Sequence, residues 1–193
     1  MRHVLLAAPL LLVAASATGQ TLFEGRYGLE TEYRFVDLTH TFARGPYLEA
    51  LYIGVPGQNE LYLGAGFQLR PAKGFTVTPA VYAVFGNEND QKGLALGGLV
   101  SVDCSGWKAL AFAGHFFRTS GDVEDYTFID ALDLTRAFGA LEAGASIGLF
   151  ETAGDATWLV GPTVKRNDRL GTWAFSARFG DDTEYRLIRI LVF

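Results

Sequence analysis

The chain has 193 residues, of which 49% are hydrophobic, with a mean hydropathy of +0.18 and a formal net charge of −5. This length predicts a single domain, which we expect to occupy residues 20–193. The excess of acidic residues argues against nucleic acid as a partner, because phosphate binding needs a basic surface. Cys104 is the only cysteine, so a small domain held together by intramolecular disulfides is excluded.

Residues 1–19 are predicted to be a secretory signal peptide. Arg2 gives a basic start, residues 4–15 form an apolar run, and Ala15-Ser16-Ala17 offers the small residues that signal peptidase prefers. The apolar run is too short for a membrane anchor, which takes about 20 residues. We therefore expect export through the Sec pathway, with cleavage after about Ala17 or Gly19.

The rest of the chain alternates between apolar and polar residues over many short segments. In residues 60–70, Leu61, Leu63 and Phe67 lie on one face, while the other face carries charge, amide and glycine. The same period of two recurs in residues 75–86, 140–150, 157–165 and 172–179. This period predicts β-strands, and the glycines and prolines between the segments predict turns.

Two features of these strands favour a membrane barrel over a soluble sandwich. Their polar faces are rich in small residues, which suits a crowded, curved interior. Aromatic residues gather near the predicted strand ends, as they do in the interfacial girdles of outer-membrane barrels. Pro79 and Pro162 fall within predicted strands, where each removes a ladder donor, so we expect them at bulges or strand ends.

The final predicted strand, residues 183–193, carries the most specific signal. Phe193, Leu191, Leu187 and Tyr185 share one face, which Arg189 interrupts. In this pattern the chain resembles bacterial outer-membrane β-barrel proteins, whose last strand commonly ends in Phe and is read by the barrel-assembly machinery. The resemblance covers the whole chain at the level of architecture, and no motif identifies a family within the class. It implies outer-membrane lipid and the assembly machinery as partners.

The fold class expected is therefore all-β, an antiparallel up-and-down transmembrane barrel of about twelve strands. Bacterial single-chain barrels have an even number of strands. We expect two strands within residues 22–42, joined near Gly28, followed by segments 46–55, 59–70, 74–86, 93–103, 107–117, 125–134, 138–150, 156–165, 170–180 and 183–193. Ten or eight strands are the alternatives.

The predicted turns fall into two sets, one for each end of the barrel. The longer, more acidic set is expected outside the cell and comprises residues 56–58, 86–92, 118–124, 151–155 and 180–183. The other set is expected on the periplasmic side and comprises residues 70–73, 103–106, 135–137 and 165–169.

If the apolar faces meet lipid, the polar faces line the interior. The candidate lumen residues are Glu60, Gln68, Arg70, Glu142, Lys165 and Arg178. Four more join them if residues 26–34 keep the same alternation, namely Arg26, Glu30, Glu32 and Arg34. Two interpretations remain open: the charges pair into a plug that stabilises a closed barrel, or they line a polar pore that selects solutes.

No catalytic or metal site emerges from the sequence. His115 has no Ser or Asp two residues away, as a positioned general base on a strand would need. Asp37 and His40 would need further ligands to hold a metal. The acidic turn containing Asp122, Glu124 and Asp125 lacks the spacing of any known calcium loop. We expect no cofactor and no resident metal, and we interpret Cys104 as incidental.

The main functional hypothesis is an integral outer-membrane barrel that acts as a narrow channel for small solutes or as a non-enzymatic surface protein. One alternative is a soluble periplasmic, lipocalin-like barrel. Its faces would be inverted, so that a ligand cavity would be lined by Leu61, Phe67, Val81, Leu149 and Phe175. A second, weaker alternative is a lipid-modifying enzyme with His115 as its base.

Overall fold

The computed structural model describes residues 19–29, 32–87, 90–181 and 183–193, which form thirteen β-strands. The strands are β1 (Gly19–Gly28), β2 (Arg34–Phe42), β3 (Pro46–Val55), β4 (Gln58–Phe67), β5 (Leu69–Ala72), β6 (Phe75–Gly86), β7 (Lys92–Cys104), β8 (Trp107–Ser120), β9 (Tyr126–Phe138), β10 (Leu141–Thr152), β11 (Asp155–Asn167), β12 (Gly171–Gly180) and β13 (Thr183–Val192). The predicted signal peptide lies outside the described residues, except for Gly19. Within the described part of the chain, no helix is long and apolar enough to cross a membrane.

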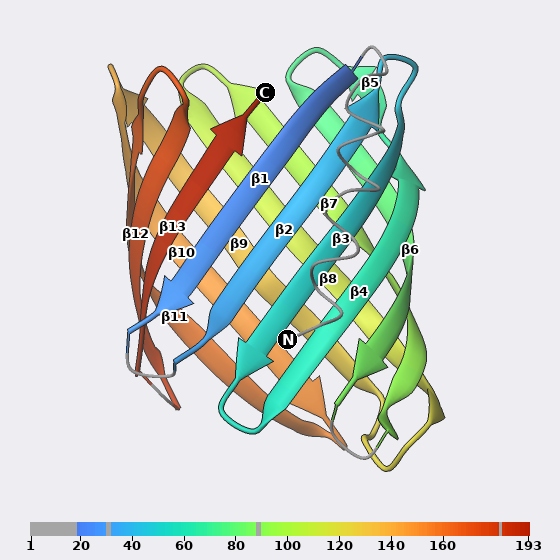
Figure 1. Cartoon of the computed structure of the whole chain (residues 1–193). Helices are drawn as coiled ribbons and strands as arrows, with labels where there is room; N and C mark the ends of the chain where they lie inside the picture. The colour runs from blue at the N-terminus through green and yellow to red at the C-terminus, as the bar shows by residue number, and fades with distance from the viewer. Residues whose placement is uncertain (1–18, 30–31, 88–89, 182) are drawn as a thin grey trace.

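The strands close into an antiparallel barrel (Figure 1). Each strand pairs with its neighbour in sequence, and the ring closes where β1 pairs with β13. β5 is a short continuation of β4 beyond Gln68, because both pair with β6. Counted around the barrel, with β4 and β5 as one, there are therefore twelve strands. This confirms the predicted strand number and the predicted turn near Gly28, and it rules out barrels of ten or eight strands.

The turns divide between two ends of the barrel, as predicted. The terminal end, at the top of Figure 1, holds the start of β1 and the end of β13, where Thr21 and Phe193 exchange two backbone hydrogen bonds of 3.1 and 2.9 Å. The other end, called here the distal end, holds the turns that follow β1, β3, β6, β8, β10 and β12, of which those after β1, β6 and β8 are the longest.

Two predicted turns are misplaced. Residues 70–72 of the predicted turn 70–73 belong to β5, and the chain reverses at Lys73 and Gly74. Residues 135–137 continue the ladder of β9, with Thr135 opposite Gly144 and Ala137 opposite Glu142. The chain reverses instead at Gly139, whose φ of 65° lies in the left-handed region that favours glycine.

Two tight hairpins fix the register of the strands they join. Ser105 and Gly106 link β7 to β8, and Ala153 and Gly154 link β10 to β11, each pair with positive φ at both residues. Two successive positive φ values define the type I′ turn, whose twist matches that of the flanking strands. Because a slip of one residue would turn every side chain to the opposite face, these turns also fix which side chains point inward.

The apolar faces point outward, as predicted for a barrel surrounded by lipid. Phe67, Val81 and Phe175 are 44%, 52% and 44% exposed, while residues next to them in sequence face the interior. A lipocalin-like barrel would enclose these side chains around a ligand. The structure therefore contradicts the inverted arrangement.

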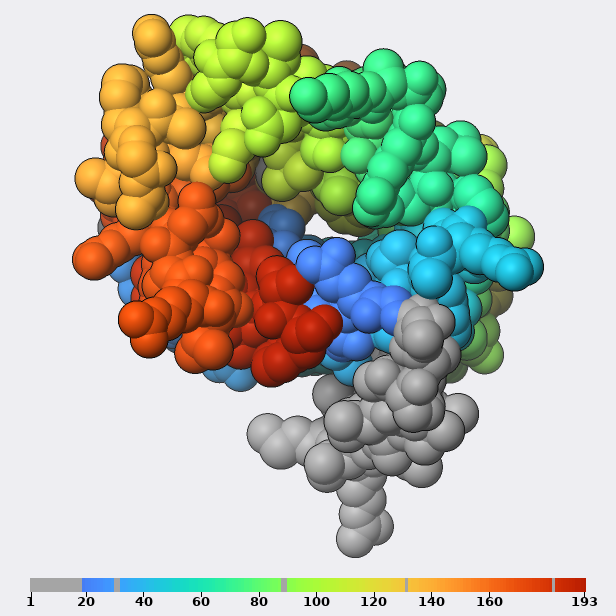
Figure 2. All heavy atoms as spheres, turned by 90° about the horizontal axis from the view of Figure 1, so that it is seen from above, coloured from blue at the N-terminus to red at the C-terminus, as the bar shows by residue number. Residues whose placement is uncertain are grey.

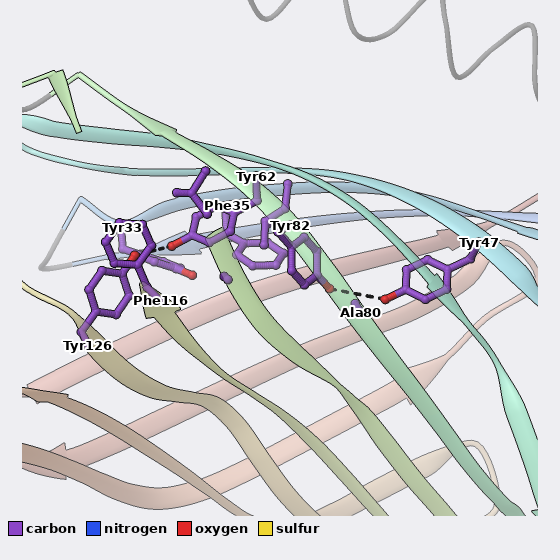
Figure 3. Packing of buried hydrophobic residues seen from close by; sticks show 11 residues of the cluster. Tyr33, Phe35, Tyr47, Tyr62, Ala80, Tyr82, Phe116 and Tyr126 are labelled. Carbon is purple, nitrogen blue, oxygen red and sulfur yellow. Dashed lines mark hydrogen bonds between the residues drawn. The ribbon is translucent and has the colours of Figure 1, made fainter. Parts of the chain in front are cut away.

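Aromatic side chains pack against inward-facing glycines on the interior wall (Figure 3). The buried cluster includes Tyr62, Tyr82 and Phe116, and Figure 3 shows the Tyr82 and Tyr47 hydroxyls directed at each other. A Cβ atom at Gly64 would lie 2.3 Å from the Tyr82 ring, and one at Gly66 would lie 2.3 Å from the Tyr47 ring. The small residues on the polar faces therefore make room for rings that lie along the wall.

The two strand prolines sit where a ladder is interrupted. Pro79 lies opposite the break between β4 and β5, since the pairing of β6 with β4 stops at Ala80 and resumes with β5 at Val77. Pro162 lies in a gap of the ladder between β11 and β12, where the register passes from Val160 directly to Thr163. Each missing N–H thus falls at an irregular position, as the sequence predicts.

Candidate functional site

A β-bulge in β9 shapes the middle of the barrel interior. The partners of β8 jump from Ile129 to Ala131 between Ala113 and Phe112, and β10 shows the matching shift. One extra residue therefore enters β9 and leaves Asp130 out of the ladder. Bulges commonly re-aim a side chain in this way, and the carboxylate of Asp130 points into the lumen.

The carboxylate of Asp130 joins a cluster of three arginines and two glutamates at mid-height. It forms ion pairs with Arg26 and, at 2.8 Å, with Arg186. Arg178 is 2% exposed and donates to the backbone oxygen of Asp130 at 2.8 Å. Glu184 accepts hydrogen bonds from both Arg178 and Arg186, and Glu24 pairs with Arg26 at 2.5 Å. Every charge in this cluster has an opposite partner, as buried charges require.

Between this cluster and the distal end lies a cavity of about 550 Å³. Aromatic and aliphatic side chains make up most of its lining, and Arg178 and Arg186 border it. Glu60 is one of the acids in its lining. It accepts hydrogen bonds from Tyr62 at 2.8 Å, from Tyr126 at 3.2 Å, and from the side-chain amides of Gln58 and Gln91, each at 3.0 Å.

A second cavity, of about 360 Å³, opens towards the terminal end. Its lining is more polar. Lys108 pairs with Glu142, Lys165 pairs with Asp133 at 2.7 Å, and Asn167 donates to Glu142 at 3.0 Å. The interior is therefore hollow at both ends, with the arginine cluster between the two cavities.

The view down the barrel shows that the centre is hollow (Figure 2). The opening is bordered by blue and green parts of the chain, which are the first half of the sequence. The red and orange strands on the opposite side, which carry Arg178, Glu184 and Arg186, fill their part of the interior more fully.

The structure places the six candidate lumen residues in two groups. Glu60, Glu142, Lys165 and Arg178 lie inside, held by the contacts above. Gln68 and Arg70 lie exposed at the terminal-end rim, where Arg70 donates to the Gln68 amide oxygen at 2.7 Å.

The expectation for residues 26–34 holds only in part. Arg26 faces inward, but Arg34 pairs with Tyr27 on the outward face. The turn between β1 and β2 breaks the alternation, so the two arginines do not share a face. Glu32 is exposed in that turn with a positive φ of 49°, and Glu30 lies outside the described residues.

The other candidates from the sequence do not gather into a site. His115 faces outward on β8, and its Nδ1 is 2.8 Å from the Thr127 hydroxyl, away from the interior acids. Cys104 is free and exposed at the end of β7, next to the turn that links β7 to β8. Within the described ranges, no three His, Cys, Asp or Glu side chains are placed to hold a metal ion.

The outward face of β13 carries Tyr185, Leu187 and Leu191, with Arg189 between the two leucines. Phe193 follows the strand and pairs through its backbone with Thr21. The guanidinium of Arg189 lies 4.8 Å from the centre of the Trp173 ring and pairs with Asp168 at 2.9 Å. Arg189 therefore folds back on the rim of the barrel instead of pointing into a lipid environment.

Sequence reasoning missed much of the interior, above all Asp130, Glu184, Arg186 and Lys108. For Asp130 a signal is present: the outward apolar residues Ile129 and Leu132 are three positions apart instead of two. A change of phase within a strand is typical of a bulge. For the other three, the alternation already indicates the interior face, but not the partner.

Comparison with solved structures agrees with the architecture. The KdgM porin matches with a TM-score of 0.66 at 12% identity, over 90% of this chain and 99% of that one. KdgM in complex with disordered oligogalacturonate gives 0.67 at 12% identity, with the same coverage. The NanC porin gives 0.60 at 10% identity, over 89% of this chain and 98% of that one. No model of a known protein family and no curated protein sequence matches the chain.

A closed, twelve-stranded antiparallel barrel with apolar outward faces and a charged interior is the fold of outer-membrane porins. The chain has this fold over almost its whole described length.

Proposed function

We propose that the protein is an integral outer-membrane channel that lets small polar solutes diffuse through a narrow lumen. The observation that carries this proposal is the interior itself. It is lined with charged and polar groups and hollowed from both ends, while the outward face is apolar. An interior of this kind favours water and polar solutes over lipid.

The comparisons support passage of solutes through a barrel of this shape. The structures of similar fold are porins, and one of them was solved with oligogalacturonate in a disordered state. The arginine cluster at mid-height would form the narrowest part of the path, so solutes would have to be small.

Export and assembly form part of the same proposal. Residues 1–19 would direct the chain through the Sec pathway. The outward face of β13, ending at Phe193, would be read by the barrel-assembly machinery, and outer-membrane lipid would surround Phe67, Val81 and their neighbours.

Membrane fractionation followed by conductance tests this function. Outer-membrane protein whose electrophoretic mobility changes on boiling would establish the folded barrel. Stepwise current through a planar bilayer containing that protein would then support the channel. The second candidate function is that of a plugged structural barrel, and the observation that supports it is the full pairing of the arginine cluster. A folded barrel that carries no current would be the result expected for this candidate.

A further inference from the structure

The charges that face the lumen divide into two unequal halves. On β1 and β8–β13, five bases form ion pairs with five acids. The bases are Arg26, Lys108, Lys165, Arg178 and Arg186, and the acids are Glu24, Asp130, Asp133, Glu142 and Glu184. This half of the interior is therefore neutral by count.

Three further interior acids form what we call the acidic wall: Asp37 on β2, Glu49 on β3 and Glu60 on β4. Their hydrogen-bond donors are uncharged. Asp37 accepts from the Thr39 hydroxyl at 3.1 Å, and Glu49 accepts from the Tyr82 hydroxyl at 2.7 Å. Glu60 accepts from two tyrosines and two glutamines. Such donors stabilise a carboxylate but leave its charge uncompensated.

The bases on this side of the barrel do not pair with the wall, and Arg70 on β5 lies at the terminal-end rim, where it donates to Gln68. Among the described residues of β2, β3, β4, β6 and β7, no Lys or Arg side chain faces the interior. Arg26, on the neighbouring strand β1, already pairs with Glu24 and Asp130.

The wall follows the length of the strands. Asp37 is in register with Leu51 and Tyr62, two residues along β4 from Glu60. Glu49 is in register with Gly64, two residues further on. Each step is about 7 Å along a strand. The opening in Figure 2 lies on the side of these early strands, and Glu60 lines the larger cavity.

We propose that the channel prefers small cations, inorganic or amine, over anions. This inference rests on the proposed channel function and names its solute class. A narrow path with low-dielectric walls concentrates ions of the sign opposite to its fixed charge. With the paired half neutral by count, the carboxyl groups of Asp37, Glu49 and Glu60 give this side of the lumen an excess of acidic groups.

The test is the reversal potential of the purified, refolded full-length protein in a planar bilayer between unequal KCl solutions. The expected permeability ratio of K⁺ to Cl⁻ is above one. Glu49→Gln should lower this ratio, and the triple variant Asp37→Asn, Glu49→Gln, Glu60→Gln should abolish the preference. Glu151→Gln, which removes an exposed charge on the outward face at the distal rim, is the matched control and should leave the ratio unchanged.

The outcomes separate the two proposals. Current with a ratio of one or below in the unmodified protein would overturn the cation preference and leave the channel standing. Absence of current from folded protein would overturn both. If the triple variant fails to fold, the single variant Glu49→Gln still tests the cation preference. This variant is expected to fold, because Glu49 is only partly buried and accepts its hydrogen bond from one tyrosine. An unchanged ratio in that variant would contradict the role of the wall.

Discussion

Asp130 is the residue on which the interior cluster depends most. Its carboxylate pairs with Arg26 and Arg186, and it is aimed there by an extra residue in β9. Replacing Asp130 by Asn keeps the shape of the side chain but leaves two buried guanidinium groups without their shared anion. Breaking a buried ion pair in this way costs about 3–5 kcal/mol.

We therefore expect Asp130→Asn to lower the free energy of unfolding by an amount in that range, as measured by urea unfolding in lipid vesicles. Asp155→Asn, the same change at an exposed turn position, is the control. Equal stability of the two variants would show that the cluster does not hold the barrel together.

Asp168, in the turn between β11 and β12, gives a pH-dependent prediction. The hydrogen bond from Arg189, and then those from the amides of Leu170 and Gly171, hold the pKa of its carboxyl below the ordinary value. A depressed pKa in the folded state contributes stability above the ordinary carboxyl pKa, and this contribution is lost as the pH falls through the folded value.

Asp168→Asn should therefore destabilise the barrel at neutral pH, and its deficit relative to the unmodified protein should shrink as the medium is acidified. The midpoints of urea unfolding at neutral and at acidic pH measure this. A deficit that stays constant over that pH range would mean that the Asp168 charge contributes nothing to the turn.

Gly64 tests the packing of rings on the interior wall. A valine there would place its Cβ atom against the Tyr82 ring, which would have to move and would lose its hydrogen bond to Glu49. Overpacking of this kind typically costs about 1–3 kcal/mol. We expect Gly64→Val to destabilise the protein by this amount, and to do so far less in a Tyr82→Ala background, where the space is free. An equal cost in both backgrounds would exclude the ring as the cause.

At the scale of elements, the period of two predicts most of what the structure shows. It gives the outward and inward faces of β4, β6, β10, β11 and β12, because successive side chains on a strand point to opposite sides. It fails in β9, where the bulge at Asp130 changes the phase, and between β1 and β2, where a turn separates Arg26 from Arg34.

The pairing of interior charges is beyond prediction from the sequence alone. Arg26 and Asp130 are 104 positions apart, and only closure of the barrel brings them together. Alternation shows that a side chain faces inward, but it contains no information on which side chain lies across the lumen. For that reason Glu60 and Arg178 were identifiable as candidates, whereas their partners were not.

The last strand, β13, closes the barrel and carries the proposed assembly signal. Phe193 is 73% exposed, so its side chain contributes little to the packing of the folded protein. We expect Phe193→Ala to reduce the amount of folded barrel in the outer membrane while leaving refolding of the purified chain in detergent unchanged. Heat-modifiability in both settings measures the two effects. Normal assembly in cells would contradict the proposed role.

At the scale of the whole molecule, the structure combines a stable frame with a polar interior. The apolar outward face and the closed ring of twelve strands suit a membrane, because among the described strands no edge is left unpaired. The paired charges of one half stabilise the interior, while the acidic wall lies on the early strands, which border the opening in Figure 2. The strands that carry the paired charges therefore differ from the strands that carry the acidic wall.

Conductance of single molecules tests the central claim most directly. The purified full-length protein, shown to be folded by its mobility shift on boiling, would be inserted into a planar bilayer under an applied voltage. The channel proposed here predicts discrete, reproducible current steps that disappear when the sample is unfolded before insertion. Folded protein that inserts without producing any current steps would contradict the claim and identify the barrel as a closed, structural one.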